Sequence, residues 1–171
     1  MKDFPLYSKN IIKHFKNPKN QGKIKNPDGT GEAGNIVCGD VMKLYLKIGK
    51  NKQGKKFIED VKFETFGCIV AIANTSILTT RIKGKTLEEA LKLRKEDLIE
   101  DLGEPLPPIK IHCSVLALDA LHEAIYDYYT RNKIFIPKKL QMEHERIQKT
   151  IESIEGRHKE FLEMEEKILN K

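Results

Sequence analysis

Three cysteines, set far apart and never in a Cys-x-x-Cys pair, constrain this chain more than any other feature. They occur in three short motifs, Cys38-Gly39-Asp40, Gly67-Cys68 and His112-Cys113. An odd number of cysteines leaves one thiol over in any disulfide framework. The wide spacing also excludes an ordinary zinc finger or zinc ribbon. If these side chains share a metal or an iron–sulfur cluster, the fold itself must bring their separate segments together.

The length of 171 residues fits one domain with an appendage. The longest apolar run is far shorter than the ~20 residues of a membrane span. Residues 1–5 have neither the apolar core of a secretory signal nor the Arg/Ser-rich character of a transit peptide. We therefore expect a cytoplasmic protein with reduced thiols and no membrane partner.

The net charge of +6 is concentrated near the start of the chain. Residues 9–26 contain no acid and six lysines, namely Lys9, Lys13, Lys16, Lys19, Lys23 and Lys25. Such a patch could meet a phosphate backbone or an acidic protein. No nucleic-acid-binding motif accompanies it, so a solvated surface or a protein partner is favoured over nucleic acid.

The first half of the chain predicts a helix followed by a small antiparallel sheet. Residues 7–15 show helical periodicity with Ser8 as the candidate N-cap. Residues 17–35 are rich in Asn, Pro, Gly and Asp and are predicted to form a loop. Apolar and polar residues alternate over 42–48 and again over 57–66, which indicates a meander of two or three strands.

The second half is predicted to be mainly helical. Helices are expected over residues 69–82, from a capping box of Thr86 and Glu89, in a short stretch within 98–106, and over 112–129. Between the last two, Pro107 and Pro108 remove backbone donors, so residues 106–110 are expected to be extended.

From Pro137 onward the pattern is different. Apolar residues recur at an unbroken spacing of seven, at Leu140, Ile147, Ile154, Phe161 and Ile168. The second line needed for a regular coiled coil is weaker, with Ile151 but also His144, His158 and Glu165. This pattern predicts a long amphipathic helix, or a helix pair broken at Gly156.

Together these patterns predict an α+β fold. A small antiparallel β-sheet of about three strands has helices packed on one face, and a C-terminal amphipathic helical extension follows. We place the domain at residues 1–132 and the extension at 133–171. The extension has eight Lys/Arg and eight Asp/Glu from Pro137 on. It is expected either to pack back onto its own core or to act as an oligomerising arm in a homodimer.

Cys68 and Cys113 each lie near the predicted start of a helix, where free N–H groups and the helix dipole favour a thiolate. Asp40 or His112 could add a fourth ligand to the three cysteines. The alternative is that each cysteine is simply a small buried hydrophobic residue. From these residues alone, a shared metal or sulfur site and ordinary packing both remain open.

The motifs also resemble those of a known family, the iron–sulfur cluster assembly scaffolds of the IscU type and the N-terminal domain of NifU. The matching residues are Tyr7-Ser8, Asn17-Pro18-Lys19-Asn20 with Gly22, Cys38-Gly39-Asp40, Phe63 with Thr65 and Gly67-Cys68, Leu106-Pro107-Pro108-Ile109-Lys110, and Ile111-His112-Cys113-Ser114. They follow the family's order and spacing over residues 1 to about 130. The proline segment favours this branch over the similar SufU-like branch.

The resemblance implies a scaffold rather than a turnover enzyme. Cys38, Cys68 and Cys113 would bind the nascent cluster, [2Fe-2S] or [4Fe-4S], with Asp40 or His112 as the exchangeable fourth ligand. A cysteine desulfurase would deliver persulfide sulfur, and recipient apo-proteins would take the finished cluster. Zinc could occupy the empty site, and a zinc-binding sulfur relay that only activates the desulfurase is the competing hypothesis.

The resemblance also assigns roles to individual residues. We expect Cys113 to be the first persulfide acceptor, with Cys38 next, and Lys110 beside Cys113 to favour its thiolate. Asp40 would keep the cluster labile. Two further expected partners are a ferredoxin as electron donor and a DnaK-type chaperone. The expected partner-binding residues are Tyr7 and the segment Leu106, Pro107, Pro108, Ile109 and Lys110, which could equally be a rigid connector that aims Cys113.

Overall fold

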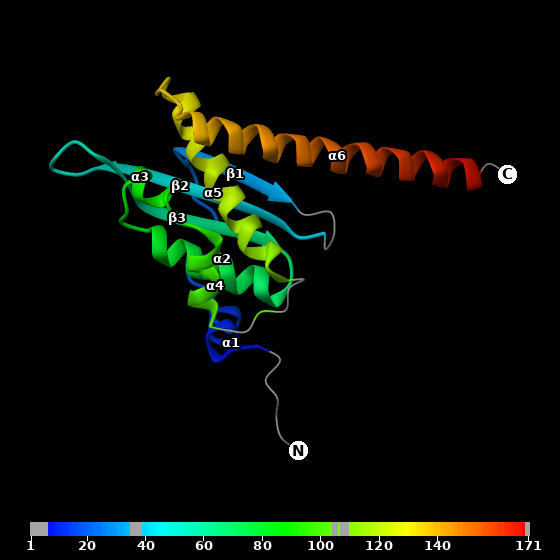
Figure 1. Ribbon diagram of the computed structural model, residues 1–171, viewed down its shortest axis with the longest axis horizontal. Helices are drawn as coiled ribbons and strands as arrows, with labels where there is room; N and C mark the ends of the chain where they lie inside the picture. Colours follow the sequence, from blue (N-terminus) through cyan, green and yellow to red (C-terminus); the bar gives the residue numbers. More distant parts are fainter. Residues whose placement is uncertain (1–6, 35–38, 104–105, 107–109, 170–171) are drawn as a thin grey trace, which may run out of the picture.

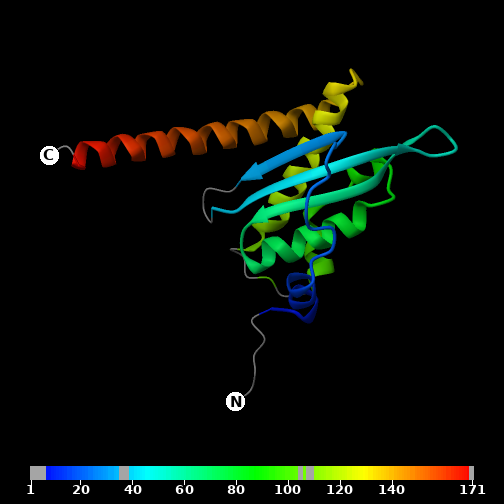
Figure 2. The same ribbon diagram turned by 180° about the vertical axis from the view of Figure 1, so that it is seen from behind.

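The computed structural model describes residues 7–34, 39–103, 106 and 110–169. Its elements, in chain order, are α1 (Lys9–Lys16), β1 (Gly29–Gly34), β2 (Val41–Lys50), β3 (Lys56–Phe66), α2 (Ile69–Ile82), α3 (Leu87–Ala90), α4 (Lys95–Leu102), α5 (His112–Arg131) and α6 (Lys138–Leu169). The three strands form an antiparallel sheet in the order β1-β2-β3. Helices α2 and α5 pack on one face of this sheet (Figures 1 and 2). The predicted α+β fold is confirmed.

The core lies between the sheet and these two helices. Alternate residues of β2 face the helices, so Met42, Leu44 and Leu46 are fully buried. Leu44 pairs across the strands with Phe63, which is also fully buried. The alternation read from the sequence thus sets which face of the hairpin is packed.

The prediction of a loop over residues 17–35 is wrong for its last part, because residues 29–34 form strand β1. Glycines weaken a strand signal, but here they allow a close approach. A Cβ on Gly31 would lie 2.0 Å from the Ala120 carbonyl oxygen, and one on Gly29 would lie 2.3 Å from the Ala124 oxygen. The edge strand therefore lies directly against the backbone of α5.

The predicted helices are present, with small shifts at their ends. Ser8 caps α1 by accepting a hydrogen bond from the Ile11 N–H. Thr86 and Glu89 form the predicted capping box, which starts a single helical turn. Helix α4 begins at Lys95, three residues before the predicted stretch, where the Asp97 carboxylate accepts from the Arg94 N–H.

Helix α6 runs without a break through Gly156, so the alternative of a broken helix pair is wrong. Its first half packs on the domain through Leu140 and Ile147, which are almost fully buried. Its second half extends away from the rest of the molecule, toward the C-terminus at the red end of the ribbon (Figures 1 and 2).

Candidate metal and sulfur site

Three of the predicted ligands meet at one end of the domain. Asp40 stands just before β2, Cys68 is the N-cap of α2, and Cys113 is the second residue of α5. One ligand atom from each lies within 4.8 Å of the other two. The fold therefore gathers residues separated by up to 73 positions in the chain.

The distances suit ligands around a shared ion rather than a disulfide. The Sγ atoms of Cys68 and Cys113 are 3.9 Å apart, well beyond the ~2.05 Å of a disulfide bond. The Cys113 Sγ lies 3.8 Å from Asp40 Oδ2 and 3.6 Å from His112 Nε2. His112 therefore lies beside Cys113, at the edge of the group formed by Asp40, Cys68 and Cys113.

Local packing fixes this arrangement. Gly67 precedes Cys68 at a point with little room for a side chain, because a Cβ there would lie 3.0 Å from the Ala71 Cβ and 3.1 Å from Asp40 Cγ. From α2, the fully buried Asn74 donates a hydrogen bond of 3.0 Å to the carbonyl oxygen of Cys113. The starts of α2 and α5 are thus held together behind the two sulfurs.

The two thiols differ in exposure and chemistry. Cys113 is fully buried, whereas Cys68 is half-buried. A hydrogen bond with Cys113, with help from the N–H groups of Ala71 and Val70, lowers the pKa of Cys68 to about 5, although burial and the charge of Asp40 oppose this. Cys68 is therefore a thiolate at neutral pH, the reactive form of cysteine.

Lys110 lies beside these sulfurs, half-buried at the entrance to α5. Burial acts to lower its pKa, but the negative charge of Cys68, a hydrogen bond with it and the charge of Cys113 outweigh burial, so the pKa of Lys110 is raised. From the sequence, Lys110 was expected to act on Cys113. Both sulfurs raise its pKa, and Cys68 contributes more than Cys113.

The remaining predicted residues are only partly covered by the structure. Cys38 and the segment Pro107, Pro108 and Ile109 lie outside the described residues. Tyr7 and Leu106 are half-buried and pack against the core. Sequence reasoning missed Asn74, because an asparagine inside an apolar helix pattern carries no local sign of the carbonyl that it meets.

A second group of ligand-capable side chains, Asp119, His122 and Glu143, lies between α5 and α6. The Arg146 guanidinium pairs with both carboxylates. Those carboxylates already have a cationic partner, so we interpret this group as part of the helix interface. The sulfur-containing group around Cys68 is the candidate functional site, and its two thiols, carboxylate and imidazole suit zinc or iron.

Residues 6–134 match the family model described as the NifU-like N-terminal domain. The chain belongs to this family. The match covers the whole of the candidate site and ends before α6 begins at Lys138. The long helix is therefore an addition to the part of the chain that the NifU-like family model recognises.

Two NifU-like relatives carry named roles. The iron–sulfur cluster assembly scaffold protein IscU 1 of Archaeoglobus fulgidus is 50% identical over 141 residues, which are 82% of this chain and 88% of that protein. The scaffold protein IscU of Escherichia coli K12 is 46% identical over 130 residues, 74% of this chain and 97% of that protein.

A solved structure has the same fold. A candidate iron–sulfur cluster assembly scaffold for the SUF system from Fervidobacterium islandicum AW-1 superposes with a TM-score of 0.57 at 28% identity, covering 70% of this chain and 96% of that chain. In the part of the chain that the structure describes, no helix combines the length and apolar character needed to span a membrane.

Proposed function

We propose that this protein is a scaffold on which an iron–sulfur cluster is assembled and from which the cluster passes to apo-proteins. One observation carries the proposal: Asp40, Cys68 and Cys113 converge within 4.8 Å in a chain about half identical to named cluster scaffolds. A scaffold needs soft ligands that hold iron and sulfide without closing the site permanently. Two thiols beside a carboxylate and an imidazole meet this need.

In this proposal Cys38, Cys68 and Cys113 bind the cluster, and Asp40 or His112 supplies the exchangeable fourth ligand. Asp40 is buried, and its Oδ2 is 3.8 Å from the Cys113 sulfur. A hard carboxylate oxygen binds iron of a cluster less firmly than a fourth thiolate would. The mixed ligand set therefore favours release of the cluster, which is the cargo of the protein.

Sulfur would arrive as the persulfide of a cysteine desulfurase. A scaffold thiolate attacks the terminal sulfur, forms a new S–S bond, and the desulfurase cysteine leaves as a thiolate. Two electrons, from a ferredoxin, then reduce the transferred sulfur to sulfide. The scaffold binds the cluster and then hands it on, as a carrier does, and we propose this role rather than that of a turnover enzyme.

The first acceptor thiol remains a prediction. Cys113 was expected from the sequence, but it is buried, whereas Cys68 is half-buried and has a lowered pKa. Because the two sulfurs are 3.9 Å apart, sulfur accepted by Cys68 could move directly to Cys113. Trapping the mixed disulfide with a desulfurase and mapping it by mass spectrometry identifies the acceptor; a link to Cys68 would contradict the prediction for Cys113.

The other parts of the proposal concern partners and organisation. We propose residues 1–132 as the scaffold domain in a cytoplasmic protein, with 133–171 as a helical extension. We propose Tyr7, Leu106 and Lys110 as the described part of a partner-binding surface, to which a DnaK-type chaperone would bind. The electrostatic influence of Tyr7 on Lys110 supports their proximity.

Anaerobic reconstitution tests the proposed function. The full chain is incubated with ferrous iron, cysteine, a reductant and a cysteine desulfurase, and is then mixed with an apo-ferredoxin. We expect cluster absorption on the scaffold that is lost as the ferredoxin gains it, and no absorption for Cys68→Ala. Tight zinc binding with faster desulfurase turnover and no cluster would instead support the sulfur relay.

Asp40→Ala provides a sharper test of the ligand set. We expect the reconstituted variant to retain its cluster several-fold longer and to transfer it more slowly, because in this proposal Asp40 is the exchangeable group that promotes release of the cluster. Decay of the cluster absorption and the rate of transfer to apo-ferredoxin measure the effect. Asp60→Ala is the control, since Asp60 pairs with Lys83 on the surface. Faster loss of cluster from Asp40→Ala would make Asp40 a stabilising ligand.

A further inference from the structure

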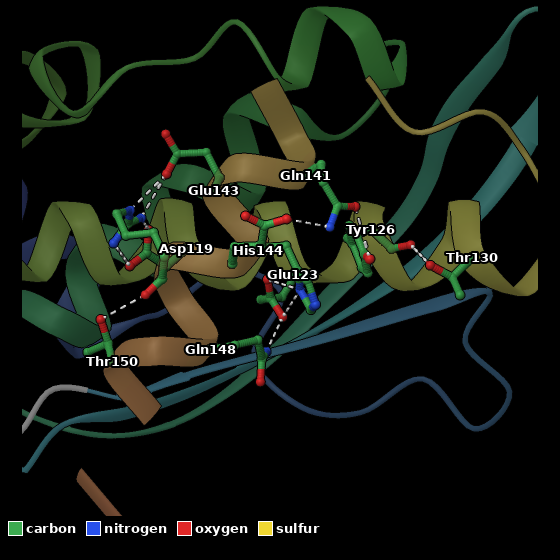
Figure 3. A network of polar contacts seen from close by, with 11 residues as sticks. Asp119, Glu123, Tyr126, Thr130, Gln141, Glu143, His144, Gln148 and Thr150 are labelled. Carbon is green, nitrogen blue, oxygen red and sulfur yellow. Dashed lines mark hydrogen bonds and ion pairs between the residues drawn. The ribbon is translucent and has the colours of Figure 1, made fainter. Parts of the chain in front are cut away.

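The first half of α6 is attached to α5 by a polar network (Figure 3). The His144 Nδ1 lies 2.9 Å from Glu123 Oε1. The Gln148 side-chain amide donates a hydrogen bond of 2.8 Å to Glu123 Oε2. The His144 ring also stacks on Tyr126, with 3.7 Å between ring centroids. One turn of α6 is therefore fixed in both position and rotation.

Ion pairs and apolar contacts extend this attachment. Arg146 reaches from α6 to Asp119 of α5 while also pairing with Glu143 of its own helix. Leu140 and Ile147 are buried under the network. Up to about Thr150, α6 is thus part of the packed domain.

Beyond this attached half the helix loses its neighbours. Its described apolar side chains there are Ile151 and Ile154, which are half-buried, and Leu162, Met164 and Ile168, which are 46%, 61% and 71% exposed. Both ribbon views show this part of α6 lying away from the sheet and the other helices (Figures 1 and 2). We call residues 151–169 the free arm.

These five apolar side chains share one side of the free arm. At about 100° per residue they fall within about 160° of the helix surface, while Lys159 and Lys167 lie on the opposite side. This apolar side of the arm is continuous with Ile147, which is buried against the domain. The apolar face that seals the first half of α6 therefore continues into the arm, where Leu162, Met164 and Ile168 are exposed.

Packing on its apolar face is what would stabilise the free arm. In proteins most helical stability comes from such tertiary packing, and Gly156 lowers the helix propensity by about 1 kcal/mol relative to Ala. An apolar face exposed over several turns also marks an interaction surface. The arm therefore requires a partner that covers this face.

We propose that the partner is the free arm of a second copy of this chain. Residues 151–171 contain six glutamates against four lysines and arginines, so the arm does not suit an anionic membrane or nucleic acid. Spacing by sevens from Ile147 through Ile154 to Ile168 supplies one of the two apolar lines by which like helices pair in a coiled coil. A two-fold axis presents the same face from both copies, so the surface is complementary to itself.

Sedimentation equilibrium of the full chain over micromolar to several hundred micromolar concentrations tests the proposal. We expect wild type to approach twice the 19.7 kDa monomer mass. Leu162→Glu with Ile168→Glu should raise the dimer dissociation constant at least tenfold. The matched control, Lys159→Gln with Lys167→Gln, makes the same change in net charge on the opposite side of the arm and should leave the constant unchanged.

Hydrogen exchange provides a second measurement on the same proteins. Amides of the arm should be protected in the wild-type dimer and should exchange rapidly in the Leu162→Glu/Ile168→Glu variant, with the domain unaffected. A wild type that stays monomeric would overturn the proposal and leave a different protein as the occupant. A dimer that survives the apolar-face variant would also overturn it, because its interface would lie elsewhere. Neither result depends on the proposed function.

Discussion

At the scale of single residues, the two thiols of the site are predicted to differ in reactivity. Cys68 is half-buried and its pKa is about 5, whereas Cys113 is fully buried. In metal-free protein at neutral pH, we therefore expect iodoacetamide to modify Cys68 at least tenfold faster than Cys113. Mass spectrometry of digested samples taken over time measures both rates. Equal rates, or faster modification of Cys113, would show that the start of α5 opens in solution.

The sequence identified the ligand-capable residues but not what holds them in place. Asp40, Cys68 and Cys113 could be predicted because glycine and histidine neighbours and helix starts mark each one locally. The hydrogen bond from Asn74 and the tight packing around Gly67 depend on contacts between distant elements. No local pattern encodes such contacts, so they become visible only in the folded chain.

At the scale of elements, β1 makes the most testable contact. A Cβ added at Gly31 would lie 2.0 Å from the Ala120 oxygen and 2.3 Å from the Ala124 nitrogen, both in the α5 backbone. Because the strand or the helix must move, we expect Gly31→Ala to lower the free energy of unfolding by about 3 kcal/mol. Chemical denaturation measures this change.

The control for this substitution lies in the same strand. A Cβ at Gly34 would meet nothing closer than the Asp40 carbonyl oxygen at 3.9 Å, so Gly34→Ala should change stability by about 0.5 kcal/mol or less. Similar losses for both variants would mean that strand conformation, rather than contact with α5, requires the glycines. The same contact explains why the sequence analysis assigned a loop here: glycines that permit close packing resemble glycines that permit turns.

At the scale of the whole molecule, the structure divides α6 into an attached half and a free arm, which the sequence could not do. The apolar spacing of seven is the same in both halves, so periodicity predicts one amphipathic helix without indicating where the domain ends. The division depends on where α5 presents Asp119, Glu123 and Tyr126 to receive the helix. These partners lie about 20 residues earlier in the chain.

Two truncations test this division. A chain ending at residue 155 retains Leu140, Ile147 and the network around Glu123, so its monomer should unfold at nearly the same urea concentration as the full chain. A chain ending at residue 136 loses both buried side chains, each worth about 1.5–3 kcal/mol, and exposes the face of α5. We expect it to fold, because the family match ends at residue 134, but to be less stable by about 3 kcal/mol. If removing the free arm alone lowers the stability of the monomer by as much, the arm must contact its own domain, and the boundary near Thr150 is wrong.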